Sequence, residues 1–209
     1  MDFQSLTSGW KQYPKFYDFS YNNSIQSGIW NDPLNFIKEK IQFLNDWGCR
    51  ADRKTVIPAI EQCRIQFNNY IQNIRDMDLL SLTSYNQDRL KDAYELLAQV
   101  EGLGPTGISK YLHMHNRGLF IMWDNQIFRD YFHIKIVNKT SATSQRYLKF
   151  LSRMRDELLD AVNSLPLSTN ISKPEAITEL RSHFNNETFP RILDKYNYAT
   201  RGQPKLKIK

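Results

Sequence analysis

A glycine-rich turn and an aspartate that follows it are the strongest candidates in this chain for ligand binding or catalysis. The turn is Gly102-Leu103-Gly104, directly before Pro105, and Asp124 ends the apolar run Phe120–Trp123. Glycine permits positive φ and leaves backbone N–H groups uncovered, and proline suits the first position of a helix, where no N–H is needed. The turn therefore predicts a helix stop followed at once by a helix start, whose amides and positive dipole end can bind a phosphate.

The segments on both sides of this turn have helical periodicity. Apolar residues recur at three- and four-residue spacing in Arg89–Val100, which predicts a helix there. A second helix is expected from Pro105 to His115. The periodic residues of the first helix are Leu90, Ala93, Tyr94, Leu97 and Val100.

Asp124 allows two interpretations. It precedes Asn125-Gln126-Ile127-Phe128, so it is a candidate helix N-cap. A fixed carboxylate at a helix start can also stabilise positive charge that develops in a transition state. Capping and catalysis do not exclude each other, and the sequence leaves both open.

Lys110 is the second candidate for chemistry. It follows Thr106 by four residues, so both lie on one helix face, about 6 Å apart along the axis. Its amine could act as a nucleophile, contact a phosphate or face solvent.

The histidines and cysteines indicate no metal site held by side chains. His113 and His115 are two residues apart on the second helix, so their side chains diverge, and each is expected to pack or to face a partner. Cys49 and Cys63 are too few for a disulfide scaffold, a four-cysteine zinc site or an iron–sulfur cluster. Cys63 lies in an apolar helix stripe. Trp47-Gly48-Cys49-Arg50 is interpreted as a helix end with a buried anchor.

Length and composition are those of a folded protein. The 209 residues allow one large or two small domains, and 41% are hydrophobic, enough for a substantial core. A formal net charge of +6 is compatible with a polyanionic partner without requiring one. No apolar stretch is long enough to span a membrane, and Met1–Tyr21 lacks the apolar core of a signal peptide. We therefore expect a monomer in a reducing compartment, the cytoplasm, nucleus or nucleoid, and not a secreted protein.

The chain as a whole predicts an all-α fold with four parts. Residues 1–30, rich in aromatic and small polar residues without a clear period, are expected to form an irregular arm. Residues 31–165 form the main helical domain, 166–200 the C-terminal helices that pack back on it, and 201–209 a basic tail. The other expected helices are Asp32–Gly48, Thr55–Arg75, Ser141 or Thr143 to Leu165, Glu175–Phe184 and Arg191–Tyr196, with Leu79–Leu82 as a connector, His133–Val137 as a short strand or extended link and Leu165–Pro174 as a linker.

Five basic residues are candidates for phosphate contacts. Arg117 and Arg129 lie on either side of Asp124 in the sequence. Arg146, Lys149 and Arg153 share one face of a predicted helix, at spacings of three and four. Such residues meet phosphates beside a DNA cleft and are otherwise solvated, and the sequence allows either.

Leu97–Tyr131 resembles the helix-hairpin-helix core of the base-excision DNA glycosylase superfamily. In that superfamily a Gly-hydrophobic-Gly hairpin is followed by a helix, a loop and an aspartate. Here Gly102-Leu103-Gly104 matches the hairpin and Phe120–Asp124 matches the loop, with Asp124 following Thr106 by 18 residues. The resemblance covers about 35 of the 209 residues.

The resemblance implies two helical lobes around a cleft that binds double-stranded DNA. The hairpin amides of Gly102, Leu103, Gly104, Thr106 and Gly107 would hold a DNA phosphate, often with a monovalent cation on the hairpin carbonyls and no other cofactor. Asp124 would stabilise the cationic sugar as the base departs, or orient the attacking water. The flipped-out base would be held by aromatic groups. Three single candidates for that pocket are Tyr111, Phe120 and Trp123, and the aromatic residues of the N-terminal arm are further candidates.

The chain departs from the lyase-type members at one position. These members have a hairpin lysine where this chain has Thr106, and threonine cannot form a Schiff base. The expected activity is therefore hydrolytic removal of a damaged or mispaired base, as in DNA repair, without strand cleavage. Lys110 is the alternative amine for a lyase step.

Three functions remain open from the sequence. The first is this DNA glycosylase, with Asp124 as its carboxylate. The second is a helix-hairpin-helix DNA-binding protein without enzymatic activity, in which Asp124 only caps a helix. The third is a structural or protein-interaction domain in which the hairpin is a packed turn.

Overall fold

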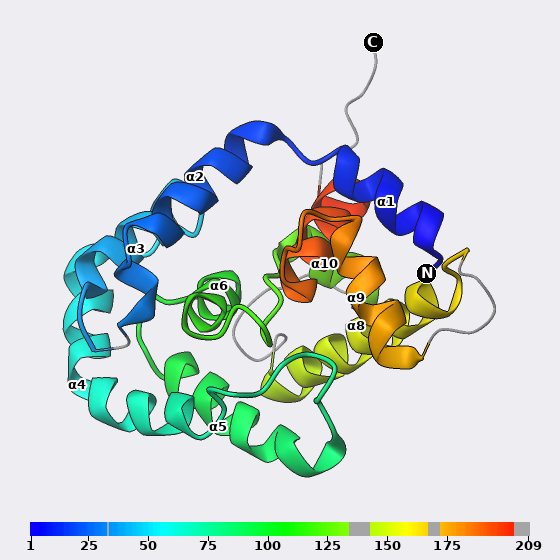
Figure 1. Ribbon diagram of the computed structural model, residues 1–209. Coiled ribbons are helices and arrows are strands. Elements are labelled where there is room, and N and C mark those ends of the chain that lie inside the picture. The colour runs from blue at the N-terminus through cyan, green and yellow to red at the C-terminus, as the bar shows by residue number, and fades with distance from the viewer. Residues whose placement is uncertain (33, 134–142, 167–171, 203–209) are drawn as a thin grey trace.

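A computed structural model describes residues 1–32, 34–133, 143–166 and 172–202, and within these residues the protein is all-helical, as the sequence predicts (Figure 1). No strand occurs in the described part. The α-helices are α1 (Phe3–Lys11), α2 (Lys15–Gln26), α3 (Ile37–Asp46), α4 (Arg53–Gln72), α5 (Gln87–Ala98), α6 (Pro105–His115), α7 (Asn125–Phe132), α8 (Ser144–Asn163), α9 (Lys173–Ser182) and α10 (Phe189–Asn197). Short 3₁₀ turns, η1 (Ile29–Asn31) and η2 (Ser84–Asn86), and a π-helical turn, η3 (Tyr198–Gly202), complete it.

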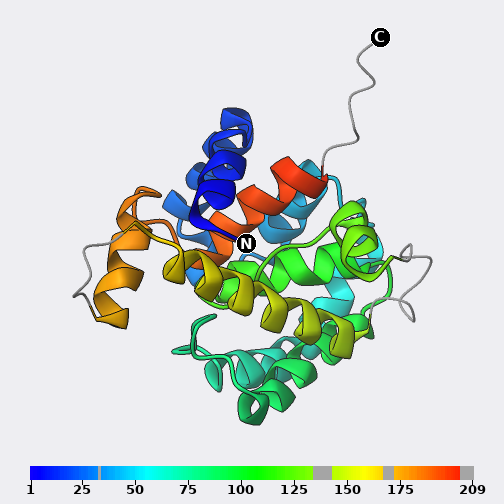
Figure 2. The same ribbon diagram turned by 90° about the vertical axis from the view of Figure 1, so that its right-hand side faces the viewer.

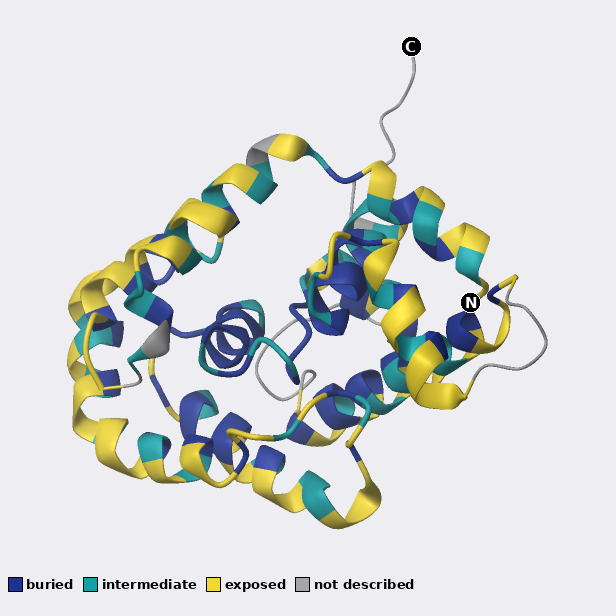
Figure 3. Ribbon diagram, in the orientation of Figure 1, coloured by how far each residue is buried: buried dark blue, intermediate teal, exposed yellow. Residues whose placement is uncertain are grey.

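Helix α6 forms the centre of the molecule, surrounded by α2, α3, α4 and α5 in Figure 1. It is buried along almost its whole length, whereas the outer helices have exposed faces (Figure 3). Its bounds are those predicted from Pro105 and the periodicity. Because a buried helix lacks a solvent-facing side, its polar groups must find partners inside the protein.

Helix α8 packs between two parts of the structure. Figure 2 shows it crossing the front of the molecule, with α5 below it and α1 and α10 above it. It contacts all three of these helices. Its buried face includes Tyr147, Leu151, Met154 and Leu158.

The prediction of an irregular N-terminal arm is wrong, because residues 3–26 are mostly helical. Asp2 caps α1 by accepting the Ser5 N–H at 2.7 Å, and Leu6 is fully buried. The segment packs on the C-terminal part of the chain, where the Phe3 N–H donates to Ser164 Oγ. Its helices were missed because α2 alternates aromatic and small polar residues and so lacks one apolar stripe.

The start of α3 also differs from the expectation. Asp32 does not cap the helix: its Oδ1 accepts the Leu34 and Asn35 N–H groups in a separate turn. The helix begins at Ile37, after Phe36, whose φ is +60°. The buried Lys40 ammonium then donates to the backbone carbonyls of Asp32 and Asn35, which fixes the turn against the helix.

Some sequence predictions lie outside the described residues. These are the strand or extended link after His133, the middle of the Leu165–Pro174 linker, and the basic tail from residue 203. None of the helices in the part of the chain that is described is long and apolar enough to cross a membrane.

Candidate active site

A cavity of about 520 Å³ lies at the N-terminal end of α6. It brings together the hairpin, Lys110, Trp123 and Asp124, which the sequence analysis selected as chemical candidates. Segments from both ends of the chain complete its wall. The other lining residues are Tyr13, Tyr17, Asp46, Trp47, Gly48, Cys49, Met122, Asn125, Ile127, Asp194 and Tyr198.

The hairpin presents free backbone donors to this cavity. Gly102 has a φ of +78°, which turns the chain out of α5, and Gly104 occupies the N-cap position of α6. Within the described residues, the N–H groups of Gly104, Thr106 and Gly107 donate no hydrogen bond. All three residues line the cavity, so their amides can bind an anion there.

The loop that ends at Asp124 is fixed by hydrogen bonds to two helices. The Trp123 N–H donates to Ser109 Oγ at 3.2 Å, and the Trp123 indole donates to the Pro105 carbonyl at 3.2 Å. The Tyr147 hydroxyl donates to the Ile121 carbonyl at 2.8 Å. The loop is therefore held on α6 and α8 before it reaches the aspartate.

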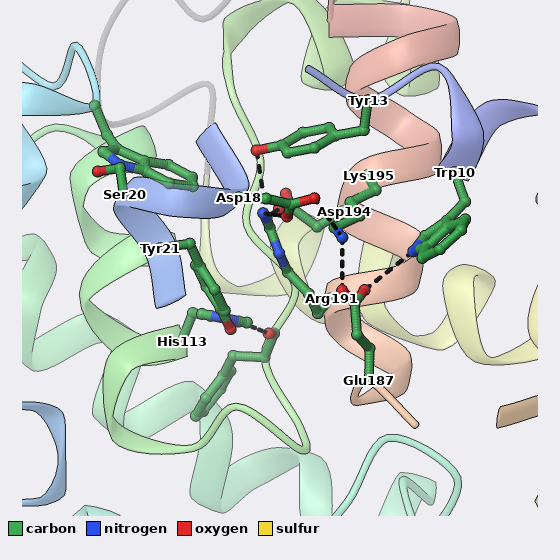
Figure 4. Close-up of polar contacts among 12 residues, drawn as sticks. Trp10, Tyr13, Asp18, Ser20, Tyr21, His113, Glu187, Arg191, Asp194 and Lys195 are labelled. Atoms are coloured by element: carbon green, nitrogen blue, oxygen red, sulfur yellow. Dashed lines mark hydrogen bonds and ion pairs between the residues drawn. The ribbon is translucent and has the colours of Figure 1, made fainter. Parts of the chain in front are cut away.

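His113 fixes the same loop from the core. Its Nδ1 lies 2.6 Å from the Phe120 carbonyl, and its Nε2 lies 2.7 Å from the Tyr21 hydroxyl (Figure 4). Since a carbonyl only accepts, Nδ1 carries the proton and Nε2 accepts from Tyr21. Burial lowers the His113 pKa to about 3, so the ring is neutral at physiological pH.

Asp124 caps α7, as one interpretation of the sequence proposed. Its Oδ1 accepts the Ile127 N–H at 2.8 Å. Burial raises the pKa of this carboxyl, while the Ile127 amide and the nearby Lys110 ammonium oppose that rise. The carboxyl lines the cavity, so the cap leaves it accessible to a ligand.

Lys110 extends from α6 into the same cavity. Its Nζ donates to the Trp47 carbonyl at 2.7 Å and lies 5.5 Å from the centre of the Trp47 ring. In the described part of the chain it makes no ion pair. It also lies beside the Cys49 thiol, whose pKa is nevertheless raised because burial outweighs the lysine's effect. The site therefore contains a cation without a bound counter-ion.

Aromatic rings form one wall of the cavity. The Tyr17 ring packs edge-on against Trp47 and Tyr198, at centroid distances of 5.8 and 5.5 Å. Tyr13 packs edge-on against Tyr198 at 5.3 Å. A planar aromatic ligand can stack on or insert between such rings.

A network of buried charges supports this wall from behind (Figure 4). The Arg191 guanidinium donates to Asp18 Oδ1 at 2.8 Å and to Asp194 Oδ2 at 2.5 Å. Lys195 Nζ donates to Asp18 at 2.8 Å and to Glu187 at 2.6 Å. The network ties α10 to α2, so it fixes the aromatic wall relative to the C-terminal helices.

Asp194 belongs both to this network and to the cavity. Burial raises its pKa to about 6, even though Arg191 and Lys110 lower it. Both carboxyls line the same cavity, and the negative charge of Asp124 adds to the rise in the Asp194 pKa.

Some of the other predicted site residues do not line the cavity. Tyr111 and Phe120 are fully buried in the core and do not line the cavity, so of the three pocket candidates only Trp123 does. The Leu103 amide donates to the Val100 carbonyl at 3.3 Å, and its side chain is buried, so its amide is already engaged. Gly102 is exposed at the turn.

None of the five basic candidates lines the cavity. Arg129 lines a separate hollow that also includes Asp124. Arg117 is half-buried, and Lys149 is exposed on α8 beside the half-buried Arg146. The exposed Arg153 pairs with Glu157 at 3.1 Å and stacks on Tyr131.

Sequence reasoning missed about half of the cavity lining. Trp47, Gly48 and Cys49 were interpreted only as a helix end, and Asp194 and Tyr198 were not selected. Tyr13 and Tyr17 were included only as members of the aromatic N-terminal arm. The one available signal was the unusual density of aromatic residues before residue 31. Nothing in their spacing connects them with α10, because that contact is tertiary.

Comparison with protein-family models, curated proteins and solved structures found no match to this chain. Among the described residues, no group of three or more His, Cys, Asp or Glu side chains is arranged to hold a metal ion.

Proposed function

We propose that this protein is a DNA N-glycosylase of the helix-hairpin-helix type, which flips out a damaged or mispaired base and removes it by hydrolysis. One observation supports this most: the hairpin amides, Lys110 and Asp124 line a single cavity. A purely structural hairpin has no need to share a cavity with a buried carboxyl and an unpaired ammonium.

The chemistry requires stabilisation of positive charge on the sugar. As the N-glycosidic bond breaks, C1′ becomes cationic, and a fixed carboxylate stabilises that charge without reorganising. Asp124 is held by the Ile127 amide and by the anchored loop, so its position is set before the substrate binds. It would stabilise the sugar or orient the attacking water.

The hairpin would bind the DNA backbone. The amides of Gly104, Thr106 and Gly107 supply donors for one phosphate, while Arg129 lies beside Asp124 for a second. Arg117, Arg146, Lys149 and Arg153 would meet phosphates further along the duplex. In this arrangement the two-lobed cleft implied by the resemblance would open over the cavity.

A monovalent cation fits the hairpin carbonyls. In the described structure the carbonyls of Gly102 and Leu103 accept no hydrogen bond. They would hold the ion, which would add positive charge next to the bound phosphate.

The flipped base would enter between the aromatic rings. Tyr17, Trp47 and Tyr198 line the cavity and offer ring faces and edges to a planar base, whereas the Trp123 side chain is only 1% exposed. The hydrogen-bonding groups next to these rings would set the choice of base.

The lyase alternative rests on the position of Lys110. Its Nζ reaches the cavity that contains Asp124, so it could attack C1′ in place of water. Borohydride trapping on an abasic-site duplex tests this step: a covalent adduct that disappears in Lys110→Ala would support it. An adduct that survives the substitution, or no adduct at all, removes the lyase reaction and leaves hydrolysis.

The main test is release of a free base from duplexes that each contain one lesion or mispair. Products are analysed with and without alkaline cleavage, since hydrolysis alone leaves an alkali-sensitive abasic site. Lys110→Gln and Asp124→Asn serve as active-site variants, and Lys173→Gln, at an exposed position of α9, serves as the matched surface control. DNA binding without base release from any duplex would favour the DNA-binding protein without activity. Absence of salt-dependent DNA binding would exclude both.

A further inference from the structure

The cavity contains a second carboxyl besides Asp124. Asp194 comes from α10 and is only 6% exposed, yet it lines the cavity. Its backbone lies in the last described α-helix, far along the chain from the hairpin that carries the proposed phosphate site.

The hydrogen bonds of Asp194 leave one of its oxygens available. Arg191 donates to Oδ2, and among the described residues no other group donates to Asp194, so Oδ1 has no donor. Arg191 is itself held by Asp18 and stacks on the Tyr21 ring at 4.1 Å, which fixes the direction of the carboxyl. A fixed carboxyl with one free oxygen in a cavity is suited to exchange a proton with a ligand.

We propose that Asp194 is a catalytic residue that donates a proton to the departing base, while Asp124 acts on the sugar and the water. This inference rests on the proposed glycosylase function. It assigns opposite tasks to the two carboxyls, a division that their different surroundings support.

The surroundings of Asp194 make it easier to protonate than an exposed carboxyl. Burial raises its pKa to about 6, and the charge of Asp124 adds to this. Arg191 and Lys110 oppose the rise without cancelling it. The titratable and charged groups that act on Asp194 from the elements around it are Arg191, Lys110, Asp124, Tyr13, Tyr21 and Tyr147.

The step balances without any further reactant. The bond between C1′ and the base nitrogen breaks with its electron pair on the nitrogen, which takes the proton of Asp194. Water bonds to C1′ and gives a proton to the Asp124 carboxylate. That proton returns to Asp194 through solvent, so one water is consumed and both carboxyls are restored.

The inference makes a specific prediction about the leaving group. A neutral base such as hypoxanthine needs a proton to leave, whereas N7-methylguanine already carries a positive charge and leaves without one. Single-turnover release from duplexes that contain either base is measured for the wild-type protein and for Asp194→Asn. We expect Asp194→Asn to slow hypoxanthine release by about 100-fold or more and N7-methylguanine release by less than about tenfold.

Asp18→Asn is the matched control, because Asp18 also binds Arg191 but does not line the cavity. It should change release of both bases by the same factor. If Asp194→Asn does not fold, as judged by circular dichroism, the wild-type pH profiles decide. The ratio of hypoxanthine to N7-methylguanine release should then fall as the pH rises above about 6. If only neutral bases are released, uracil and the better leaving group 5-fluorouracil provide the same contrast.

The outcomes separate the two proposals. Equal losses for both bases, parallel pH profiles, or release of cationic bases alone would overturn the role of Asp194 and leave the glycosylase intact. If the wild-type protein releases no base from any duplex, the proposed function fails, and this inference fails with it.

Discussion

Two groups of buried charges lie side by side in this protein and differ in how completely they are paired. Around Arg191 and Lys195, each cation contacts two carboxylates, and every charge has a partner within 2.8 Å. In the cavity, by contrast, Lys110 contacts a backbone carbonyl and a ring, and Asp124 accepts from a backbone amide. Burying an unpaired charge costs free energy, so the cavity group, Lys110 and Asp124, is suited to pair with the charges of a bound ligand. The paired group around Arg191 and Lys195 holds the helices together.

Removing the central cation of the paired group should have the largest effect. Arg191→Met leaves Asp18 and Asp194 without their common partner in a buried site. We expect the free energy of unfolding to fall by about 3–5 kcal/mol, measured by urea denaturation. Arg153→Met is the control, because its ion pair with Glu157 is exposed and should contribute at most about 1 kcal/mol. Equal losses in the two variants would contradict a structural role for the paired group.

Asp124→Asn tests the cavity group, and it should change activity much more than stability. Asparagine caps helices about as well as aspartate, so the unfolding free energy should change by less than about 1 kcal/mol. The rate of base release should fall by about 100- to 1,000-fold, because the amide lacks the negative charge. A variant that is destabilised but equally fast in releasing base would show that Asp124 is only a cap.

His113 should make the free energy of unfolding depend on pH. Its pKa in the folded protein is about 3, below the ordinary value of 6.5, so the unfolded chain binds a proton first as the pH falls. The contribution of neutral His113 to the free energy of unfolding is thus fully present above pH 6.5. As the pH falls from 6.5 to 3, this contribution decreases by about 1.4 kcal/mol per pH unit. His113→Gln should flatten the slope of unfolding free energy against pH between 4.5 and 6.5.

Two glycines of the hairpin offer the finest comparison. Gly102→Ala should lower the unfolding free energy by about 1–2 kcal/mol, because its φ is +78° and an added Cβ would lie 3.0 Å from Val56. Gly104→Ala meets no atom within 4 Å and should cost less, about 0.5–1 kcal/mol, because alanine is a poorer N-cap residue than glycine. Because Gly104 lines the cavity, the added methyl group would take up space at the proposed phosphate site, so affinity for duplex DNA should fall. Unchanged affinity in Gly104→Ala, measured by fluorescence anisotropy at fixed salt, would argue against phosphate binding there.

The sequence predicted the parts of the structure that local rules control. Gly102, Gly104 and Pro105 set the hairpin and the start of α6, and the position of Asp124 before α7 follows from capping. The paired group and the aromatic wall could not be predicted, because Asp18, Arg191 and Tyr198 meet only through tertiary packing. Their helices are short, and α2 has no clear apolar face that would have suggested a partner.

The order of the lining segments along the chain has a consequence for synthesis. A growing polypeptide produces the aromatic segment with Tyr13 first, then the hairpin and Asp124, and Asp194 and Tyr198 last. Until α10 has left the ribosome, Asp18 has no basic partner from that helix, and the cavity lacks one side. A nascent chain that is stalled before residue 189 should therefore hold the hairpin and Asp124 beside an incomplete cavity, which gains its remaining wall only after α10 and Tyr198 have been synthesised.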